Sequence, residues 1–316
     1  MILIGDVREQ LKQLPDQSVN CVVTSPPYWG LRDYRNDGQI GLEQTPEQYI
    51  EQMVLVFREV WRVLKNDGTL WLNLGDSYAS FRDGKATPDT TRGDSKGTLV
   101  PKGSAANRMA NSFSGSFIKH KDLVGIPWRV AFSLQQDGWY LRQDIIWHKP
   151  NPMPESVLDR CTKAHEYIFL LTKSSRYYFD NEAIKEPSAQ LGKTNIRFGG
   201  NKYGDSDDPK HATKSGNTYV DSGKRNKRSV WTVTTRPFKG AHFATFPPAL
   251  IEPCILAGCP EGGTVLDPFF GAGTTGLVAQ RHNRKWIGCE LNPEYAAIAQ
   301  TRIEAESTLF TIGDTQ

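Results

Sequence analysis

The sequence predicts an α/β fold with a mostly parallel, doubly wound sheet, and three observations support this prediction. Short β-branched apolar runs alternate with helix-like patterns in the first and the last third of the chain. With 316 residues, 38% of them hydrophobic, the chain can bury a substantial core. Its longest apolar runs, such as residues 167–171, are far shorter than a membrane span. We therefore expect a soluble protein without membrane contact, with helices on both faces of the sheet.

The first segment has the pattern of a β-α-β unit. Residues 1–4 and 20–24 have the composition of short strands, and residues 7–14 between them have helical spacing. A second helix is predicted to begin at Thr45, because a hydroxyl followed by Pro46 and Gln48 is a strong start signal, and to end at 66–68. Its apolar stripe consists of Ile50, Met53, Val54, Phe57, Val60, Trp61 and Leu64.

The alternation continues along the chain. Strands are predicted at 69–74, 140–147 and 166–172, with a helix at 127–136. The last part reads as helix 247–257, strand 264–266, helix 274–281, strand 285–289 and helix 293–304. In open sheets of this kind, ligands bind beyond the carboxyl ends of the strands. The turns that follow the strands are therefore the places to look for chemistry.

Two segments lack this regularity and carry most of the positive charge. The net charge is only +3, but residues 183–240 hold 12 Lys and Arg against 5 Asp and Glu, and residues 80–122 hold 8 against 4. Both are rich in Gly, Ser, Asn, Asp and Thr, so we expect basic loop insertions on a regular core. They can be solvated linkers, or they can approach a polyanion from one side. The candidate cations for contacts with such a polyanion are Lys224, Arg225, Lys227 and Arg228.

A glycine loop follows the strand at 264–266. It reads D-P-F-F-G-A-G-T-T-G, and Gly271 to Gly276 matches G-x-G-x-x-G, with Glu290 ending the next strand. A nicotinamide dinucleotide is one possible ligand, but Asp267 would then face the pyrophosphate with like charge. S-adenosylmethionine fits better. Asp267 could accept from its ammonium group, the helix start near Thr274 could take its carboxylate, and Glu290 could hold its ribose hydroxyls.

A proline-locked turn follows the strand at 20–24 and reads S-P-P-Y. Pro26 and Pro27 fix the backbone and leave rigid carbonyl acceptors beside the Ser25 hydroxyl, while Tyr28 offers a flat ring. An exocyclic amine of a nucleobase is a poor nucleophile because its lone pair is delocalised into the ring. A serine oxygen and a carbonyl that accept from this amine would direct the lone pair at a methyl group. The base must leave the duplex to reach such a pocket.

The glycine loop and T-S-P-P-Y together resemble the amino-methylating DNA methyltransferases, and their order, with S-P-P-Y early, is similar to the permuted beta group. The resemblance covers nearly the whole chain. It implies the Rossmann-like fold of S-adenosylmethionine-dependent methyltransferases and assigns three regions. Residues 1–182 form the catalytic part, with an insertion at about 80–122. Residues 183–240 form the target-recognition region, and residues 241–316 form the cofactor-binding part of the same core.

The resemblance also assigns roles to single residues. It implies that Ser25, Pro26, Pro27 and Tyr28 are catalytic. The cofactor-binding residues that it implies, together with those argued from the glycine loop, are Asp6, Phe246, Pro247, Asp267, Phe269, Gly271, Gly273, Thr274 and Glu290. In this family S-P-P-Y is associated with N4 of cytosine and D-P-P-Y with N6 of adenine. Ser25 therefore favours cytosine, and adenine stays the alternative, with a nicotinamide-dependent dehydrogenase more remote.

Other features limit the partners and the compartment. Five cysteines at irregular spacing predict neither disulfides nor a zinc site, and Asp6 and Glu9 interrupt any secretory signal, so we expect a cytoplasmic protein without a bound metal. The expected partner is double-stranded DNA. A restriction endonuclease acting on the same site is a possible second partner, and the protein is expected to be a monomer or a homodimer.

Overall fold

The computed structural model describes residues 1–31, 36, 38–79, 118–188, 194–196, 218–220, 223–235 and 245–313. It divides into two compact units, residues 1–179 with 229–316 and residues 180–228. The basic insertion expected at 80–122 falls largely outside the described residues. Within the described parts of the chain, every helix is too short or too polar to span a bilayer.

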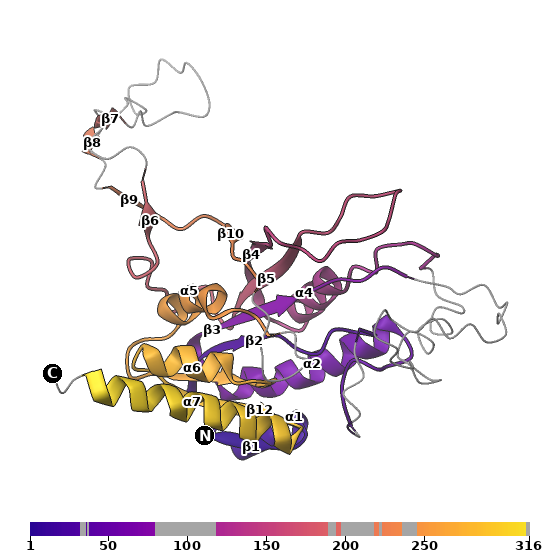
Figure 1. Cartoon of the computed structure of the whole chain (residues 1–316), viewed down its shortest axis with the longest axis horizontal. Coiled ribbons are helices and arrows are strands. Elements are labelled where there is room, and N and C mark those ends of the chain that lie inside the picture. Colours follow the sequence, from indigo (N-terminus) through magenta and orange to yellow (C-terminus); the bar gives the residue numbers. More distant parts are fainter. Residues whose placement is uncertain are drawn as a thin grey trace, which may run out of the picture. The chain divides into compact units, whose positions relative to one another are not determined.

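The larger unit is built on an eight-stranded sheet (Figure 1). Its strands are β1 (Ile2–Ile4), β2 (Val19–Thr24), β3 (Leu64–Leu74), β4 (Tyr140–His148), β5 (His165–Thr172), β10 (Val230–Thr232), β11 (Thr264–Asp267) and β12 (Lys285–Glu290). They lie in the order β1-β12-β11-β2-β3-β5-β4-β10, and only β5 runs antiparallel to its neighbours among these strands. The predicted mostly parallel sheet is confirmed.

The two ends of the chain meet in the middle of this sheet. β11 pairs with β2 through Val265 opposite Cys21 and Leu266 opposite Val22. On its other side β11 pairs with β12, which pairs with β1. The carboxyl ends of four parallel strands, two from the start of the chain and two from its end, therefore lie along one edge. This is the permuted order that the sequence predicts.

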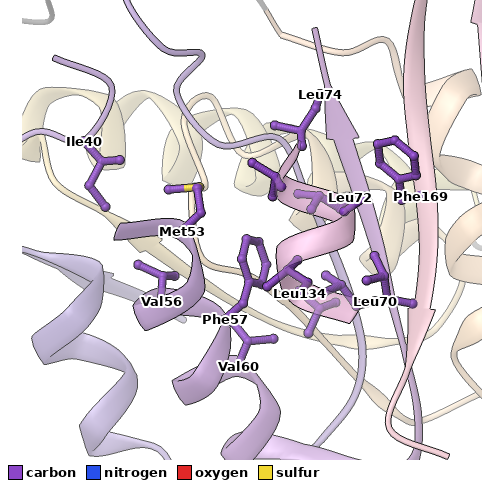
Figure 2. Close-up of a cluster of buried hydrophobic side chains, with 14 of the residues drawn as sticks. Ile40, Met53, Val56, Phe57, Val60, Leu70, Leu72, Leu74, Leu134 and Phe169 are labelled. Carbon is purple, nitrogen blue, oxygen red and sulfur yellow. The ribbon is translucent and has the colours of Figure 1, made fainter. Parts of the chain in front are cut away.

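Helices cover both faces of the sheet. On one face lie α1 (Val7–Gln10), α2 (Pro46–Val63) and α4 (Ile126–Gln136), and on the other lie α5 (Pro248–Gly258), α6 (Thr274–Arg281) and α7 (Pro293–Gly313). Met53, Phe57 and Val60 of α2 pack against alternate residues of β3 (Figure 2). The intervening residue Trp71 points to the opposite face, where it lies beside Phe179 and Trp231. This alternation follows from the two-residue period of a strand.

Most predicted elements form, with shifted ends. The Thr45 side chain accepts from the Gln48 N–H, and the Gln48 side chain accepts in return from the Thr45 N–H, which is the expected capping box. The predicted end of this helix at 66–68 is wrong, because α2 ends at Val63 and β3 already begins at Leu64. The strand pairing of Leu64 with Val19 ends the helix early. Helix α7 extends to Gly313, beyond the predicted end at residue 304.

The smaller unit, residues 180–228, holds two short antiparallel ladders. β6 (Glu186–Pro187) pairs with β9 (Lys224–Arg225), and β7 (Thr194–Ile196) pairs with β8 (Thr218–Val220). Arg225 and Arg228 both donate to the Glu186 carboxylate, at 2.9 and 2.5 Å. The first ladder is therefore braced by charge as well as by backbone hydrogen bonds. The four predicted DNA-binding cations lie in this unit, and their role stays a prediction.

Candidate active site

A cavity of about 520 Å³ lies at the carboxyl edge of the sheet, within the size range of small-molecule sites. Nine of the predicted site residues line it, and they come from both ends of the chain. These residues are Asp6, Ser25, Pro26, Pro27, Tyr28, Phe246, Phe269, Gly271 and Glu290. The structure thus brings the S-P-P-Y turn and the glycine loop to one cavity, although more than 240 residues separate Ser25 from Phe269.

The glycine loop and the end of β12 are joined by hydrogen bonds through Glu290. One carboxylate oxygen accepts from the Gly271 N–H at 2.7 Å, and the other accepts from the Asn292 N–H at 2.9 Å. Burial raises the pKa of Glu290, although these backbone donors act against the rise. Each oxygen retains a lone pair, so the carboxylate can still accept from hydroxyl groups of a ligand.

The two phenylalanines of D-P-F-F have different surroundings. Phe269 lines the cavity, whereas Phe270 is buried and stacks on Trp286 with ring centroids 5.4 Å apart. A Cβ atom at Gly288 would lie only 2.2 Å from the Phe270 ring, so that ring requires a glycine in the neighbouring strand. Burial of Phe270 anchors the loop and leaves Phe269 as its apolar contribution to the cavity.

Asp6 also lines the cavity and lies just after β1, whose last residue Ile4 pairs with Glu290. Its carboxylate caps α1 by accepting from the Arg8 N–H at 2.9 Å, and it is paired with the Arg8 guanidinium. The Arg8 hydrogen bond is the main cause of a lowered pKa at Asp6. Asp6 therefore presents an ionised, firmly oriented carboxylate to the cavity.

Asp267 differs from the expectation that its carboxylate faces the mouth of the loop. It is buried and is not among the described residues that line the cavity. One oxygen accepts from the Thr24 hydroxyl at 2.6 Å and from the Phe269 N–H at 3.0 Å, and the other accepts from the Thr275 hydroxyl at 2.7 Å. A direct contact with a cofactor stays a prediction. The geometry gives Asp267 a structural role, because it ties the end of β2 to the start of the glycine loop.

Three other predicted cofactor residues also lie outside the cavity lining. Gly273 has φ +73°, and a Cβ atom there would lie 2.8 Å from Cβ of Ala299, so it allows close packing of the loop on α7. The Thr274 hydroxyl accepts from the Arg302 guanidinium at 2.9 Å and is buried. Pro247 is buried directly before α5, beside the cavity residue Phe246. All three shape the wall, and ligand contacts for them stay predictions.

The S-P-P-Y turn is rigid beyond its two prolines. The buried Tyr49 hydroxyl donates to the Pro27 carbonyl at 3.0 Å. On the other side of the turn, Gly75 leaves room for the Tyr28 ring, because a Cβ atom at Gly75 would lie 2.5 Å from Cε2 of Tyr28. Contacts from α2 and from the end of β3 therefore fix the position of Tyr28 and of the turn that contains it.

A polar network that the sequence analysis did not assign surrounds Tyr28. The Ser25 hydroxyl donates to the Tyr28 oxygen at 3.4 Å, and the Tyr28 hydroxyl donates to the Glu166 carboxylate at 2.7 Å. The Asn73 amide donates to the same carboxylate at 3.2 Å, and Lys149 forms an ion pair with it. Burial raises the pKa of Tyr28 well above its ordinary value, so the phenol stays protonated and acts as a donor.

The sequence contained a signal for this network. Asn73 is a polar residue among the apolar residues 70–74, and Glu166 is a charged residue at the start of an apolar strand. Both lie at strand ends, Asn73 near the carboxyl end of β3 and Glu166 near the amino end of the antiparallel β5. The antiparallel direction of β5 was needed to place Glu166 at the edge that carries Ser25.

This fold and this cavity define an α/β protein with a ligand-sized cavity between a glycine loop and a rigid S-P-P-Y turn. The profile of the DNA methylase family, covering the N6 and N4 enzymes, matches residues 19–301. The chain belongs to this family and is a DNA methyltransferase. The predicted resemblance is therefore confirmed, and the family membership decides against the dehydrogenase alternative.

Individual relatives agree with this assignment. The chain is 49% identical over 305 residues to the Type II methyltransferase M.Cfr9I of Citrobacter freundii, covering 96% of this chain and 87% of that one. It is similar in fold to the PvuII DNA methyltransferase (cytosine-N4-specific), with a TM-score of 0.63, 21% identity and coverage of 96% and 85%.

A further similar structure is that of TTHA0409 from Thermus thermophilus, solved in complex with S-adenosyl-L-methionine. Its TM-score is 0.56, with 23% identity and coverage of 96% and 95%. The predicted Rossmann-like fold is confirmed, and S-adenosylmethionine is the cofactor of the family.

Proposed function

We propose that the protein is a site-specific DNA methyltransferase that methylates the exocyclic N4 of cytosine in double-stranded DNA. The observation that supports this proposal most strongly is that Ser25, directly after β2, lines the same cavity as Phe269 and Gly271 of the glycine loop and Glu290 at the end of β12. Base flipping is required because the amine of a paired base is enclosed in the duplex.

The residues at the cofactor side fit S-adenosylmethionine. The remaining lone pairs of Glu290 suit two ribose hydroxyls, and the oriented carboxylate of Asp6 suits an adenine amine. Phe269 and Phe246 provide apolar walls. Asp267, Gly273, Thr274 and Pro247 support this wall through the contacts described above. When bound, S-adenosylmethionine supplies an electrophilic methyl group on a sulfonium.

The residues at the base side would activate the acceptor. The Ser25 oxygen and the Pro26 carbonyl accept hydrogen bonds from the exocyclic amine, which directs its lone pair along the transfer axis. Pro27 keeps the turn rigid, and its own carbonyl is engaged by Tyr49. Tyr28 lies beside Ser25 and presents its ring to the flipped base, while Glu166 and Asn73 hold that ring through its hydroxyl. Lys149 in turn pairs with Glu166. The residues supply positioning rather than a covalent intermediate.

Cytosine is favoured over adenine as the acceptor for two reasons. The turn begins with Ser25 rather than with the aspartate associated with N6 of adenine. The similar PvuII structure also carries the name cytosine-N4-specific. N6 of adenine is the alternative, because the same pair of acceptors can hold an adenine amine.

The name of the relative M.Cfr9I supports a Type II, site-specific activity. In this proposal residues 183–240 contribute target recognition, and Lys224, Arg225, Lys227 and Arg228 contact DNA phosphates. A restriction endonuclease acting on the same site is the proposed partner in the cell.

The test is to incubate the purified protein with plasmid DNA and isotope-labelled S-adenosylmethionine, and to identify the labelled nucleoside by mass spectrometry. The proposal predicts N4-methylcytosine at one short sequence. Labelled N6-methyladenine would support the alternative, and label in C5-methylcytosine would contradict both.

A further inference from the structure

The loop 149–164, which joins β4 to β5, leaves the sheet at the edge that carries the cavity. β5 is antiparallel to β3 and pairs Tyr167 with Leu74, so its first residues lie at the carboxyl end of β3. The Lys149 N–H donates to the Ala164 carbonyl at 2.8 Å and closes the base of the loop. Figure 1 shows this hairpin extending away from the ends of both strands.

The outer part of this loop exposes apolar side chains. Met153 is 86% exposed and also lines the cavity, and Leu158, near the middle of the loop, is fully exposed. Val157 beside it is 37% exposed. Leu158 follows Met153 by five positions, so its backbone lies no more than about 17 Å from that of Met153 in the cavity wall, the span of a fully extended chain.

Ion pairs and ring contacts hold the loop in place. The Arg160 guanidinium lies 3.7 Å from the centroid of the Tyr78 ring and pairs with Glu155 at 2.5 Å. Lys121, from the segment before α4, pairs with Asp159 at 2.6 Å. Both carboxylates of the outer loop are thus matched by cations. A polyanion can approach this loop without meeting an uncompensated negative charge.

A base that leaves a duplex opens a gap of one stacking step, and proteins that distort DNA fill such steps with Leu, Met, Phe, Ile or Pro side chains. We infer that Leu158, with Val157 beside it, inserts into the base stack at the position vacated by the flipped base. Met153 lines the passage between this wedge and the cavity. The inference rests on the proposed function and adds a residue that promotes flipping without contacting the reacting atoms.

The position of the tip favours DNA over a protein partner as its occupant. The flipped base has to enter the cavity from solvent, and Met153 belongs both to the cavity wall and to the loop. The duplex must therefore lie close to the cavity wall, no farther from it than the length of this loop. Leu158 has little other role in the folded protein, since its side chain is fully exposed.

The test compares Leu158→Ala with the parent protein on two synthetic duplexes that carry the sequence found methylated in the plasmid. In one duplex the target base is paired. In the other it lies opposite an abasic site, which removes most of the cost of flipping. Leu55→Ala, an exposed leucine on α2, is the matched control. We expect Leu158→Ala to lower kcat/KM on the paired duplex by about 10-fold or more and to leave the abasic duplex within about 2-fold.

The possible outcomes separate this inference from the proposed function. An equal loss on both duplexes, or no loss on either, contradicts the wedge while leaving the methyltransferase proposal intact. Absence of turnover by the parent on both duplexes contradicts the proposed function itself and the wedge with it. Because Leu158 is fully exposed, the alanine variant leaves no cavity, and its thermal unfolding should match that of the parent. A Leu158→Met variant, which keeps an apolar wedge, should recover most of the activity on the paired duplex.

Discussion

The Tyr28 hydroxyl lies at the centre of the polar network on the side of the cavity where we propose that the flipped base binds. It accepts from Ser25, donates to Glu166 and lies 3.2 Å from the Asn73 side-chain oxygen. The ring can lie beside a base only if its tilt is fixed, and the hydrogen bonds of this hydroxyl add to the packing at Gly75 and the Tyr49 contact that hold the turn. Orientation by the network is therefore separable from the apolar contact that the ring itself provides.

Tyr28→Phe keeps the ring and removes these hydrogen bonds. We expect the turnover number to fall by about 10-fold, which corresponds to about 1.4 kcal/mol of lost transition-state stabilisation, while the affinity for S-adenosylmethionine stays within about 2-fold. Single-turnover kinetics and calorimetric binding measure the two quantities. Tyr177→Phe, the same change outside the cavity lining, should alter neither. A large loss of affinity for S-adenosylmethionine in Tyr28→Phe would contradict the proposal that Tyr28 acts on the base and not on the cofactor.

Asp267, the last residue of β11, joins the two halves of the sheet because its carboxylate accepts from the Thr24 hydroxyl at the end of β2. Burial raises the pKa of Asp267 to about 6, although donors from Thr24, Thr275 and Phe269 oppose the rise. Folding thus favours the protonated carboxyl relative to the unfolded value of 3.8. The resulting stabilisation is complete below about pH 3.8 and is lost as the pH rises through about 6.

Asp267→Asn should remove this dependence, because the amide stays neutral and can keep the same partners by donating to Thr275. At pH 7 its free energy of unfolding should exceed that of the parent by on the order of 3 kcal/mol, and the difference should vanish below about pH 4. Denaturant unfolding from pH 4 to 8 measures it. Exposed Asp144→Asn controls for the loss of a charge. A variant that is less stable than the parent at pH 7 would show that the ionised carboxylate holds the two strands together.

The elements themselves were largely predictable, and the exceptions have physical causes. The capping box at Thr45 and the helix that starts at Thr274 depend on local residues, so the sequence was sufficient for them. The end of α2 at Val63 was not predictable, because it depends on the pairing of Leu64 with Val19, a contact between distant residues. The network at Glu166 was missed for a similar reason, since it requires the antiparallel placement of β5.

For the molecule as a whole, the sequence predicted which residues belong to the site, but it did not predict which contacts these residues make. Nine of them line one cavity, but Asp267 lies behind it, because a buried carboxylate needs the three donors that only the folded sheet supplies. The predicted DNA-binding role of residues 183–240 is a separate prediction. It depends on charge rather than on the cavity.

The predicted contacts between the four cations and DNA phosphates can be tested by measuring how DNA binding depends on salt concentration. The variant has alanine in place of Lys224, Arg225, Lys227 and Arg228. The slope of log binding constant against log salt concentration should become less steep by about 0.9 for each phosphate that is no longer neutralised. The slope is measured by fluorescence anisotropy on one duplex at several salt concentrations. Because Arg225 and Arg228 share Glu186, we expect a total smaller than that of four fully neutralised phosphates. Lys285→Ala is the control, and an unchanged slope in the four-residue variant would mean that this ladder does not touch DNA.

In the proposed function, Ser25 orients an amine beside a cofactor bound at the same carboxyl edge. The most direct measurement is the single-turnover methylation rate of Ser25→Ala together with its affinity for S-adenosylmethionine. We expect a rate lower by about 100-fold with an affinity within about 2-fold of the parent. An unchanged rate, or an affinity that falls as far as the rate, would contradict it.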